Sequence, residues 1–206
     1  MIVIENDRAP RGTDRLLAAM FEARKQVFVD LLGWDVPVLE QRFEIDQFDD
    51  EHATYIILSG VEGAHRASAR LLKTTRPHIL DGLFPYLCAG PVPYGPDVLE
   101  ITRFCLDRRL GAVARREARN QLVSALVIYA LEHQVRTFTG VAEMAWLQQI
   151  LAFGWVCRPL GIPATVNGRP TGALAIEIDE QTPRLLERNG IWAEPFSEAA
   201  LLAEAA

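Results

Sequence analysis

The order in which strand and helix patterns alternate along the 206 residues is the feature that most restricts the fold. Apolar residues recur at helical spacing in some segments and form short runs rich in β-branched and aromatic residues in others. In chain order we expect strand 1–5, helix 14–32, strands 53–59, 65–72 and 97–106, helix 111–133, strand 136–142, helix 143–153, and strands 155–160 and 173–178. This order predicts an α/β fold with a mixed, twisted sheet and helices on both faces.

The segments between these elements are expected to be irregular. Residues 33–52 have no periodicity and many acids, and residues 76–96 carry five prolines and three glycines. Thr13 or Asp14 can cap the first helix, and a short helix is expected to follow Thr182-Pro183. We find no internal repeat and no linker, so we expect a single domain covering residues 1–206.

Composition excludes several classes of protein. Half of the residues are hydrophobic, enough for a real core, and 21 basic against 27 acidic side chains give a net charge of −6, which argues against a general nucleic-acid binder. No apolar run is long enough to insert into a membrane, and residues 1–7 lack a signal-peptide pattern. Widely spaced Cys88, Cys105 and Cys157 suggest a reducing, cytoplasmic location.

Arg24 lies on the apolar stripe of the first expected helix, between Phe21 and Phe28. A charge there should pair with a carboxylate or point into a cleft. The simpler alternative is an arginine whose stem lies on the core and whose head reaches water.

Three carboxylates, Asp46, Asp49 and Asp50, fall within five residues of the acidic loop. They repel one another unless cations lie among them, so either arginines or a cationic ligand could complete this cluster. A solvated acidic loop is the alternative. Trp34, just upstream, offers a flat surface for stacking on a ring or a cation, or is simply a core residue.

Charged residues also interrupt two of the expected apolar strands. Glu100 and Arg103 lie in strand 97–106 and face opposite sides in regular geometry, whereas a bulge between them would bring both into one site. Arg70 lies in strand 65–72. Structural ion pairs or edge positions are the alternatives for all three.

A basic run begins where the strand 97–106 gives way to the long helix. It contains Arg108, Arg109, Arg115, Arg116 and Arg119. Helix N-termini and arginines both attract anions, so an acidic or phosphorylated carrier protein would fit, and a solvated helix face is the alternative. Arg108–Val113 nearly matches the phosphate loop of GNAT acetyltransferases, but Val113 stands where Gly or Ala is expected, so it is equivocal about coenzyme A.

No metal site is expected. The four histidines have no metal-ligand spacing, and the chain contains no GxSxG, HExxH, P-loop or GxGxxG motif.

Taken together, the charged and aromatic positions resemble those of the LuxI-type acyl-homoserine lactone synthases over about residues 1–165. The matching positions are Arg24, Phe28, Trp34, Asp46, Asp49, Arg70, Phe84, Glu100 and Arg103. The resemblance implies a GNAT-like acyltransferase fold that makes a quorum-sensing signal from S-adenosylmethionine and an acyl thioester on acyl carrier protein or coenzyme A. S-adenosylmethionine is then a substrate, and no cofactor is implied.

In the implied reaction the α-amine of S-adenosylmethionine attacks the thioester, and the methionyl carboxylate then displaces the sulfonium group and releases methylthioadenosine. Glu100 is our first candidate for the base, with Asp46 competing. Asp46 and Asp49 suit the amine and sulfonium, or hold Arg24 and Arg70. Arg103 can hold the methionyl carboxylate, while Phe28 and Trp34 line the adenosine side.

The acyl pocket is expected around residues 137–153 with Leu99 and Ile101. Thr139 lies near the position where relatives that prefer 3-oxo chains place Ser or Thr, although Gly140 or Ala142 could hold that register. Phe84, Phe104 and Trp146 are further substrate-binding candidates, and Trp146 could instead simply pack.

Two other functions compete with the synthase. One is a GNAT-type N-acyltransferase that uses acyl-coenzyme A on another amine, and the other is a ligand-binding module without turnover. The sequence determines neither the acyl chain nor the oligomeric state.

Overall fold

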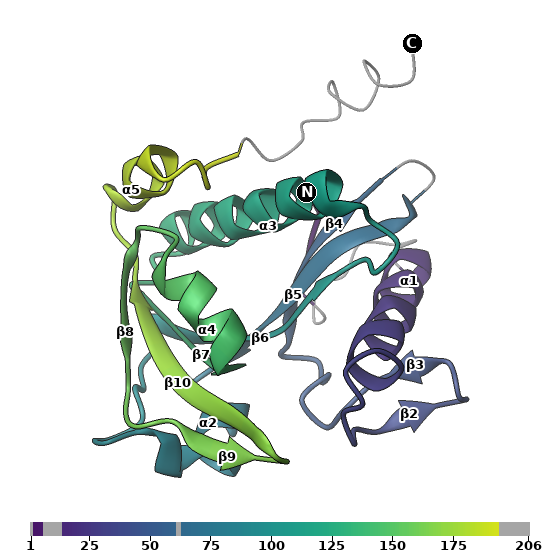
Figure 1. Cartoon of the computed structure of the whole chain (residues 1–206), viewed down its shortest axis with the longest axis horizontal. Coiled ribbons are helices and arrows are strands. Elements are labelled where there is room, and N and C mark those ends of the chain that lie inside the picture. Colours follow the sequence, from purple (N-terminus) through teal and green to yellow (C-terminus); the bar gives the residue numbers. More distant parts are fainter. Residues whose placement is uncertain (1, 6–13, 61–62, 194–206) are drawn as a thin grey trace. The chain divides into compact units, whose positions relative to one another are not determined.

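The computed structural model describes residues 2–5, 14–60 and 63–193, so Thr13, one of the two predicted cap residues, lies outside the described residues. The chain divides into two compact units, whose helices and strands are labelled in Figure 1. Of the described residues, the first unit comprises 2–5, 14–60, 63–70, 103–125 and 193, and the second comprises 71–102 and 126–192. A single domain stays a prediction, and each unit is described by itself below.

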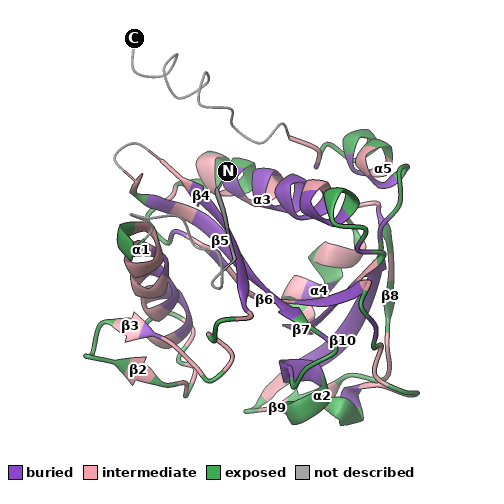
Figure 2. Ribbon diagram, turned by 180° about the vertical axis from the view of Figure 1, so that it is seen from behind, coloured by how far each residue is buried: buried purple, intermediate pink, exposed green. Residues whose placement is uncertain are grey.

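Strands β1, β4, β5 and β6 supply the sheet of the first unit, as predicted. Their bounds are β1 (Ile2–Glu5), β4 (Thr54–Ser59), β5 (His65–Lys73) and β6 (Val98–Leu106), the last two continuing into the second unit. β1 and β4 are antiparallel, and β4 lies between β1 and β5. β4 is buried along most of its length, and its side chains Tyr55–Leu58 are almost inaccessible to solvent (Figure 2).

The first helix is shorter than predicted. α1 (Asp14–Arg24) gives way to one turn of π-helix, η2 (Lys25–Val29), in which the Asp30 amide donates to the Lys25 carbonyl at 3.1 Å. The hydrogen bond of this wider turn spans five residues instead of the four of an α-helix, and such turns are frequent at functional sites. It buries Val27 and Phe28 in a core cluster, with Trp34 packed against that cluster. A regular helix to Leu32 is therefore a wrong prediction.

The acidic segment 33–52 is not all loop, which is a second wrong prediction. β2 (Val38–Leu39) and β3 (Phe43–Glu44) form a small antiparallel hairpin. Its turn places Glu40 and Gln41 at φ of 52° and 56°, the left-handed region that hairpin turns normally fill with Gly or Asn. The sequence therefore carries no recognisable turn signal here, although the hairpin fixes the place of Glu44.

The second unit has a mixed sheet. β7 (Thr137–Glu143) is parallel to β6 from Val98 to Glu100 and antiparallel to β10. The other strands are β8 (Val156–Pro159), β9 (Ala164–Val166) and β10 (Arg169–Glu177), of which β9 and the first part of β10 were not predicted. Both β8 and β9 pair antiparallel with β10.

Helices cover both faces of β10, as predicted. α2 (Ile79–Leu83) contributes Leu80 to a cluster with Ala173. A Cβ built on the neighbouring Gly172 would lie 2.9 Å from Leu147 of α4 (Met144–Leu151). Because adjacent strand residues point to opposite faces, α2 and α4 lie on opposite sides of this strand.

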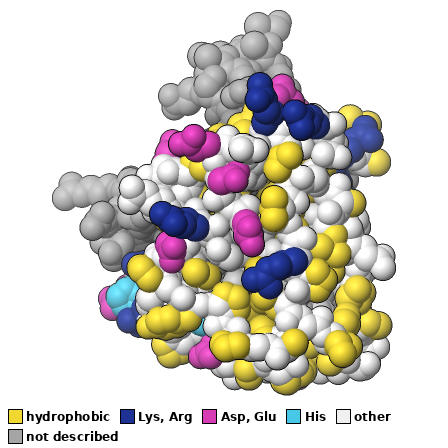
Figure 3. Space-filling view, turned by 90° about the vertical axis from the view of Figure 1, so that its left-hand side faces the viewer, with side chains coloured by type: hydrophobic (Ala, Val, Ile, Leu, Met, Phe, Trp, Pro, Cys, Tyr) yellow, Lys and Arg dark blue, Asp and Glu magenta, His cyan; other side chains and the backbone are white. Residues whose placement is uncertain are grey.

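Residues 76–96 were predicted to be mostly loop, and within them the structure has α2 and a short 3₁₀ turn, η4 (Pro85–Leu87). α5 (Thr182–Arg188) follows β10, as expected. On the side of this unit that carries β8, apolar side chains gather toward the end that holds α2 and β9 (Figure 3). None of the helices within the described ranges has the length and hydropathy needed to cross a bilayer.

Helix α3 (Ala112–Glu132) runs from the first unit into the second, close to the predicted bounds. Its buried face, with Ala118, Leu122 and Leu126 among its members, repeats every three to four residues.

A buried histidine in the first unit makes stability depend on pH. His65 is 4% exposed, its Nε2 lies 2.8 Å from Ser68 Oγ, and burial lowers the pKa of His65 to about 4 although Asp107 opposes that shift. The unfolded chain takes up this proton near pH 6.5, so stability is full above that pH and falls between pH 6.5 and 4. We expect His65→Gln to remove about 2 kcal/mol of the stability difference between pH 8 and pH 5, measured by urea denaturation. An unchanged difference would contradict a neutral buried imidazole.

Candidate active site

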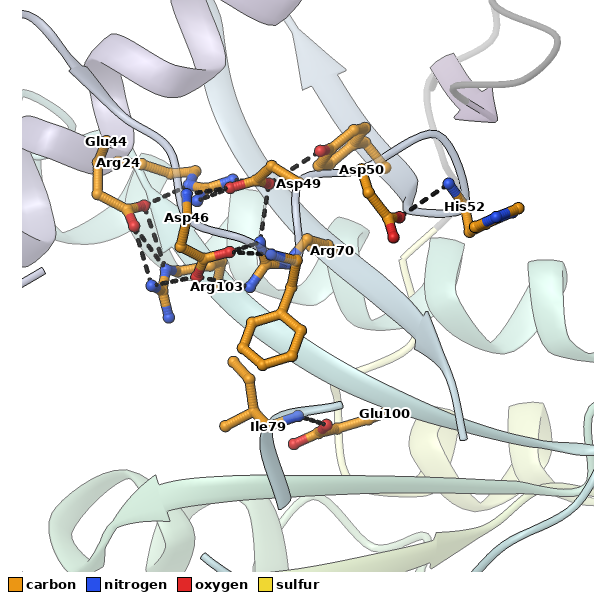
Figure 4. Close-up of polar contacts among 12 residues, drawn as sticks. Arg24, Glu44, Asp46, Asp49, Asp50, His52, Arg70, Ile79, Glu100 and Arg103 are labelled. Atoms are coloured by element: carbon orange, nitrogen blue, oxygen red, sulfur yellow. Dashed lines mark hydrogen bonds and ion pairs between the residues drawn. The ribbon is translucent and has the colours of Figure 1, made fainter. Parts of the chain in front are cut away.

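Three arginines and three carboxylates form one polar cluster in the first unit (Figure 4). The arginines come from α1, β5 and β6, and the carboxylates come from β3 and the loop that follows it. The six residues are Arg24, Arg70, Arg103, Glu44, Asp46 and Asp49. Their formal charges cancel, since three positive groups face three negative groups.

Arg24 uses its whole guanidinium group. Nε donates to Glu44 at 2.6 Å, while Nη1 and Nη2 each donate to one oxygen of Asp49 at 2.8 Å. All three side chains are at most 1% exposed. The predicted carboxylate partner for a charge on this apolar stripe is therefore present, and a snorkelling arginine is excluded.

Arg70 makes a bidentate ion pair with Asp46. Its Nη1 and Nη2 lie 2.6 and 3.0 Å from the two Asp46 oxygens, and Nη1 also lies 2.8 Å from Asp49. The loop is closed further by the Asp46 amide, which donates to Asp49, and by the Phe48 amide, which donates to Asp46. These contacts attach the acidic loop to β5.

Arg103 links Glu44 to Asp46. Its Nη2 donates to Glu44 at 2.9 Å and to Asp46 at 2.7 Å, and its Nε donates to Glu44 at 3.1 Å. Its backbone has a φ of 50°, so β6 leaves regular strand geometry at this residue. The bulge considered from the sequence was expected to bring Glu100 and Arg103 into one site, but the two side chains have different partners. Strain of this kind persists where surrounding contacts hold it and is concentrated at functional sites.

One nitrogen of Arg103 is still available. Among the described residues, Nη1 has no hydrogen-bond or ion-pair partner. The guanidinium carbon lies 5.6 Å from the Phe28 ring and 5.7 Å from the Trp34 ring. Those rings are stacked on each other with centroids 4.7 Å apart. A cationic donor thus lies beside a flat aromatic pair.

Asp49 and Arg24 hold each other in their charged forms. Burial raises the pKa of Asp49, but hydrogen bonds and charge from Arg24, with the charge of Arg70, outweigh it and hold that pKa well below the usual range. Burial lowers the pKa of Arg24, but hydrogen bonds and charge from Asp49 and Glu44 outweigh burial and raise that pKa. Burial and Asp49 also raise the pKa of Tyr55, whose hydroxyl donates to Asp49 at 2.8 Å.

Sequence reasoning missed Glu44 and misplaced Asp50. Glu44 is fully buried and binds two arginines, whereas Asp50 is exposed and accepts a hydrogen bond from the His52 amide. The hairpin β2–β3 decides between them, because it ends on Glu44 and turns this side chain inward. Only the alternation of strand residues, Glu44 and Asp46 being two apart, could have indicated it.

Glu100, in the second unit, has different partners from Arg103. Its carboxylate is fully buried and accepts hydrogen bonds from the amides of Ile79 at 2.8 Å and Leu80 at 3.0 Å, at the start of α2 (Figure 4). Phe84 ends that helix and packs, partly buried, against a core cluster.

Thr139 is the register partner of Glu100 across β6 and β7. Its side chain is fully buried, and its Oγ1 has no hydrogen-bond partner among the described residues. It shares a face with Val141, which packs against the cluster of α2, so Gly140 and Ala142 point to the opposite face.

The remaining aromatic candidates are half-buried. Trp146 makes an edge contact with Phe153 at 5.8 Å, and Phe104 lies on β6 beyond Arg103.

The basic run surrounds the start of α3. Arg108 and Arg116 are exposed and Arg115 and Arg119 are half-buried, while Arg109 pairs with Asp107 at 2.7 Å. Val113 is 70% exposed. Across residues 2–5, 14–60 and 63–193, no group of three His, Cys, Asp or Glu side chains is placed to hold a metal ion.

The mixed sheet with helices on both faces is similar to the fold of GNAT-type N-acetyltransferases. A Lactobacillus plantarum protein classed as an N-acetyltransferase has this fold, with a TM-score of 0.57 at 17% identity over 86% of this chain and 97% of its own. That likeness shows the fold alone.

The family comes from closer matches. Residues 11–186 match the autoinducer synthase family model. An acyl-homoserine-lactone synthase of Ralstonia nicotianae is 35% identical over 85% of this chain and 87% of its own length. The chain therefore belongs to the autoinducer synthase family and is an acyl-homoserine-lactone synthase.

Two solved structures agree with this family. TofI in a ternary complex with an inhibitor and MTA is 30% identical, with a TM-score of 0.76 over 97% of this chain and 98% of that one. BjaI, a CoA-dependent acyl-homoserine lactone synthase solved with SAM and isopentyl-CoA, is 28% identical, with a TM-score of 0.78 over 98% and 96%. The resemblance inferred from nine residues is thus confirmed.

Proposed function

We propose that this synthase binds S-adenosylmethionine at the arginine–carboxylate cluster of the first unit. The observation that supports this is Nη1 of Arg103, a cationic donor beside the stacked rings of Phe28 and Trp34. The methionyl carboxylate suits the guanidinium, and the adenine ring suits the aromatic pair. TofI was solved with MTA and BjaI with SAM, which fits a nucleoside-containing substrate here.

The other members of the cluster serve this site by position and by charge. Arg24 pairs with Asp49 and Arg70 pairs with Asp46, so both side chains are fixed in place for a substrate that carries an ammonium and a sulfonium group. Because their partners are already in place, little reorganisation is needed when the substrate binds.

The reaction has two bond-forming steps. The deprotonated α-amine attacks the thioester carbonyl, and the tetrahedral intermediate expels the thiol, leaving an amide. The carboxylate oxygen then attacks the γ-carbon and closes the lactone. The bond between that carbon and the sulfonium sulfur breaks, and its electron pair leaves on the sulfur of methylthioadenosine. The second step is intramolecular, so holding the carboxylate at Arg103 supplies much of its rate.

The amine needs a proton acceptor before it attacks. Glu100 and Asp46 are the two candidates, each acting through a water molecule. The pH profile of acylation in Glu100→Gln separates them, because loss of the acidic limb would assign the base to Glu100 and a retained limb would leave Asp46.

The acyl group is proposed to lie beside β7. Thr139 Oγ1 is a buried hydroxyl suited to a polar atom on the acyl chain, and Phe84 and Trp146 of the same unit provide apolar walls. The donor is an acyl carrier protein or coenzyme A. An acidic carrier suits the arginines around the start of α3, which are Arg108, Arg109, Arg115, Arg116 and Arg119, and BjaI shows that a relative uses a CoA thioester.

A cytoplasmic location fits the free cysteines Cys88, Cys105 and Cys157.

The test is turnover with a defined donor series. The purified protein is incubated with S-adenosylmethionine and butanoyl-to-dodecanoyl thioesters, each on coenzyme A and on acyl carrier protein. We expect one acyl-homoserine lactone per methylthioadenosine, measured by liquid chromatography and mass spectrometry. An acylated product without methylthioadenosine would contradict the proposal and favour an N-acyltransferase on another amine.

A further inference from the structure

We propose that Glu100 acts as a positioning residue that sets the place of Phe84 by holding the start of α2. This inference rests on the proposed function, because Phe84 is assigned there to the acyl site. It gives Glu100 a task other than proton transfer.

The first step of the argument is the direction of the Glu100 carboxylate. Oε2 accepts from the Ile79 amide at 2.8 Å, and Oε1 accepts from the Leu80 amide at 3.0 Å, with Oε2 3.2 Å from the same amide. The side chain is fully buried. Charge-assisted hydrogen bonds in a buried setting are strong, so both oxygens are bound to α2.

The second step is the weakness of α2 on its own. The helix has five residues, far fewer than a helix needs to form alone in water. Its N-cap residue, His78, makes no side-chain capping hydrogen bond. Glu100, which lies 20 residues after Leu80, therefore supplies the cap that the local sequence lacks.

The third step links α2 to the acyl site through the backbone of one residue, Leu80. The Leu80 amide donates to Glu100, and the Leu80 carbonyl accepts from the Phe84 amide at 3.2 Å. Leu80 and Leu87, on either side of Phe84, are buried in one cluster with Ala173 of β10. A shift at Glu100 is therefore transmitted to Phe84 in a single helical turn.

A double-mutant cycle tests the inference. It combines Glu100→Gln with Phe84→Ala and uses the fastest thioester of the donor series. We expect each single change to lower kcat/KM for the thioester about tenfold, and the double variant to match the worse single variant, because both act on one contact. Effects that multiply to about a hundredfold would overturn it.

Two further readouts separate positioning from proton transfer. Glu100→Gln should keep the wild-type pH dependence of kcat/KM, whereas loss of the acidic limb would overturn the inference. Glu100→Asp keeps a carboxylate but cannot reach both amides, so it should be as poor as Glu100→Gln. Activity close to wild type in Glu100→Asp would contradict us.

Amide hydrogen exchange tests α2 without turnover. The Leu80 amide should exchange at least tenfold faster in Glu100→Gln, and Asp81→Asn, an exposed acid of the same helix, should leave it unchanged. Equal exchange in wild type and Glu100→Gln would overturn the inference. If wild type makes no methylthioadenosine with any thioester, the proposed function fails instead, and the exchange result still decides this point.

Discussion

Asp49→Asn should destabilise the protein by about 3–5 kcal/mol, the cost typical of removing one partner from a buried ion pair. Asp49 is the carboxylate that both Arg24 and Arg70 contact at 2.8 Å, and its side chain is fully buried. The asparagine keeps the size but removes the charge, so two buried guanidinium groups lose a counter-charge. Burial without pairing is costly because the protein interior solvates ions poorly.

Urea denaturation at pH 7.5 measures this loss. Asp50→Asn is the matched control, because Asp50 is the exposed neighbour and an asparagine can still accept the hydrogen bond of the His52 amide. We expect the control to change the unfolding free energy by less than about 0.5 kcal/mol. Equal, small losses in both variants would show that the cluster contributes no net stability through Asp49.

Glu44→Gln should lower kcat/KM for S-adenosylmethionine about a hundredfold, the size of effect that follows from a misplacement of about 1 Å in a reacting group. Glu44 is the carboxylate shared by Arg24 and Arg103. Without its charge, Arg103 is less firmly held in its left-handed backbone conformation, and the proposed carboxylate site at Nη1 moves.

Release of methylthioadenosine and isothermal titration with S-adenosylmethionine measure this effect, at a temperature where the denaturation curve shows the variant folded. Glu40→Gln, an exposed acid in the turn of the same hairpin, is the control and should retain wild-type kcat/KM. A Glu44→Gln enzyme within twofold of wild type would remove Arg103 from the proposed carboxylate site.

The main helices and strands could be predicted from the pattern of apolar residues in the sequence. Strands β4, β5, β6 and β7 and helices α3 and α4 lie within one or two residues of their expected bounds, because each strand buries a short apolar run and each helix buries an apolar face of helical period. The elements that were missed, among them the β2–β3 hairpin and α2, lack local signals. The hairpin turns on Glu40 and Gln41 without a glycine, and α2 is capped by a carboxylate distant in sequence.

The site divides in the same way. Charges on apolar positions revealed Arg24, Arg70, Glu100 and Arg103 from the sequence, because a buried charge requires a partner. The choice of partner was decided by tertiary structure, since a hairpin brings Glu44 rather than Asp50 to Arg24, and α2 takes Glu100. By itself the sequence determined which side chains must be paired. Only the folded chain decided the pairs, because hydrogen bonds depend on where distant segments meet and not on their spacing along the chain.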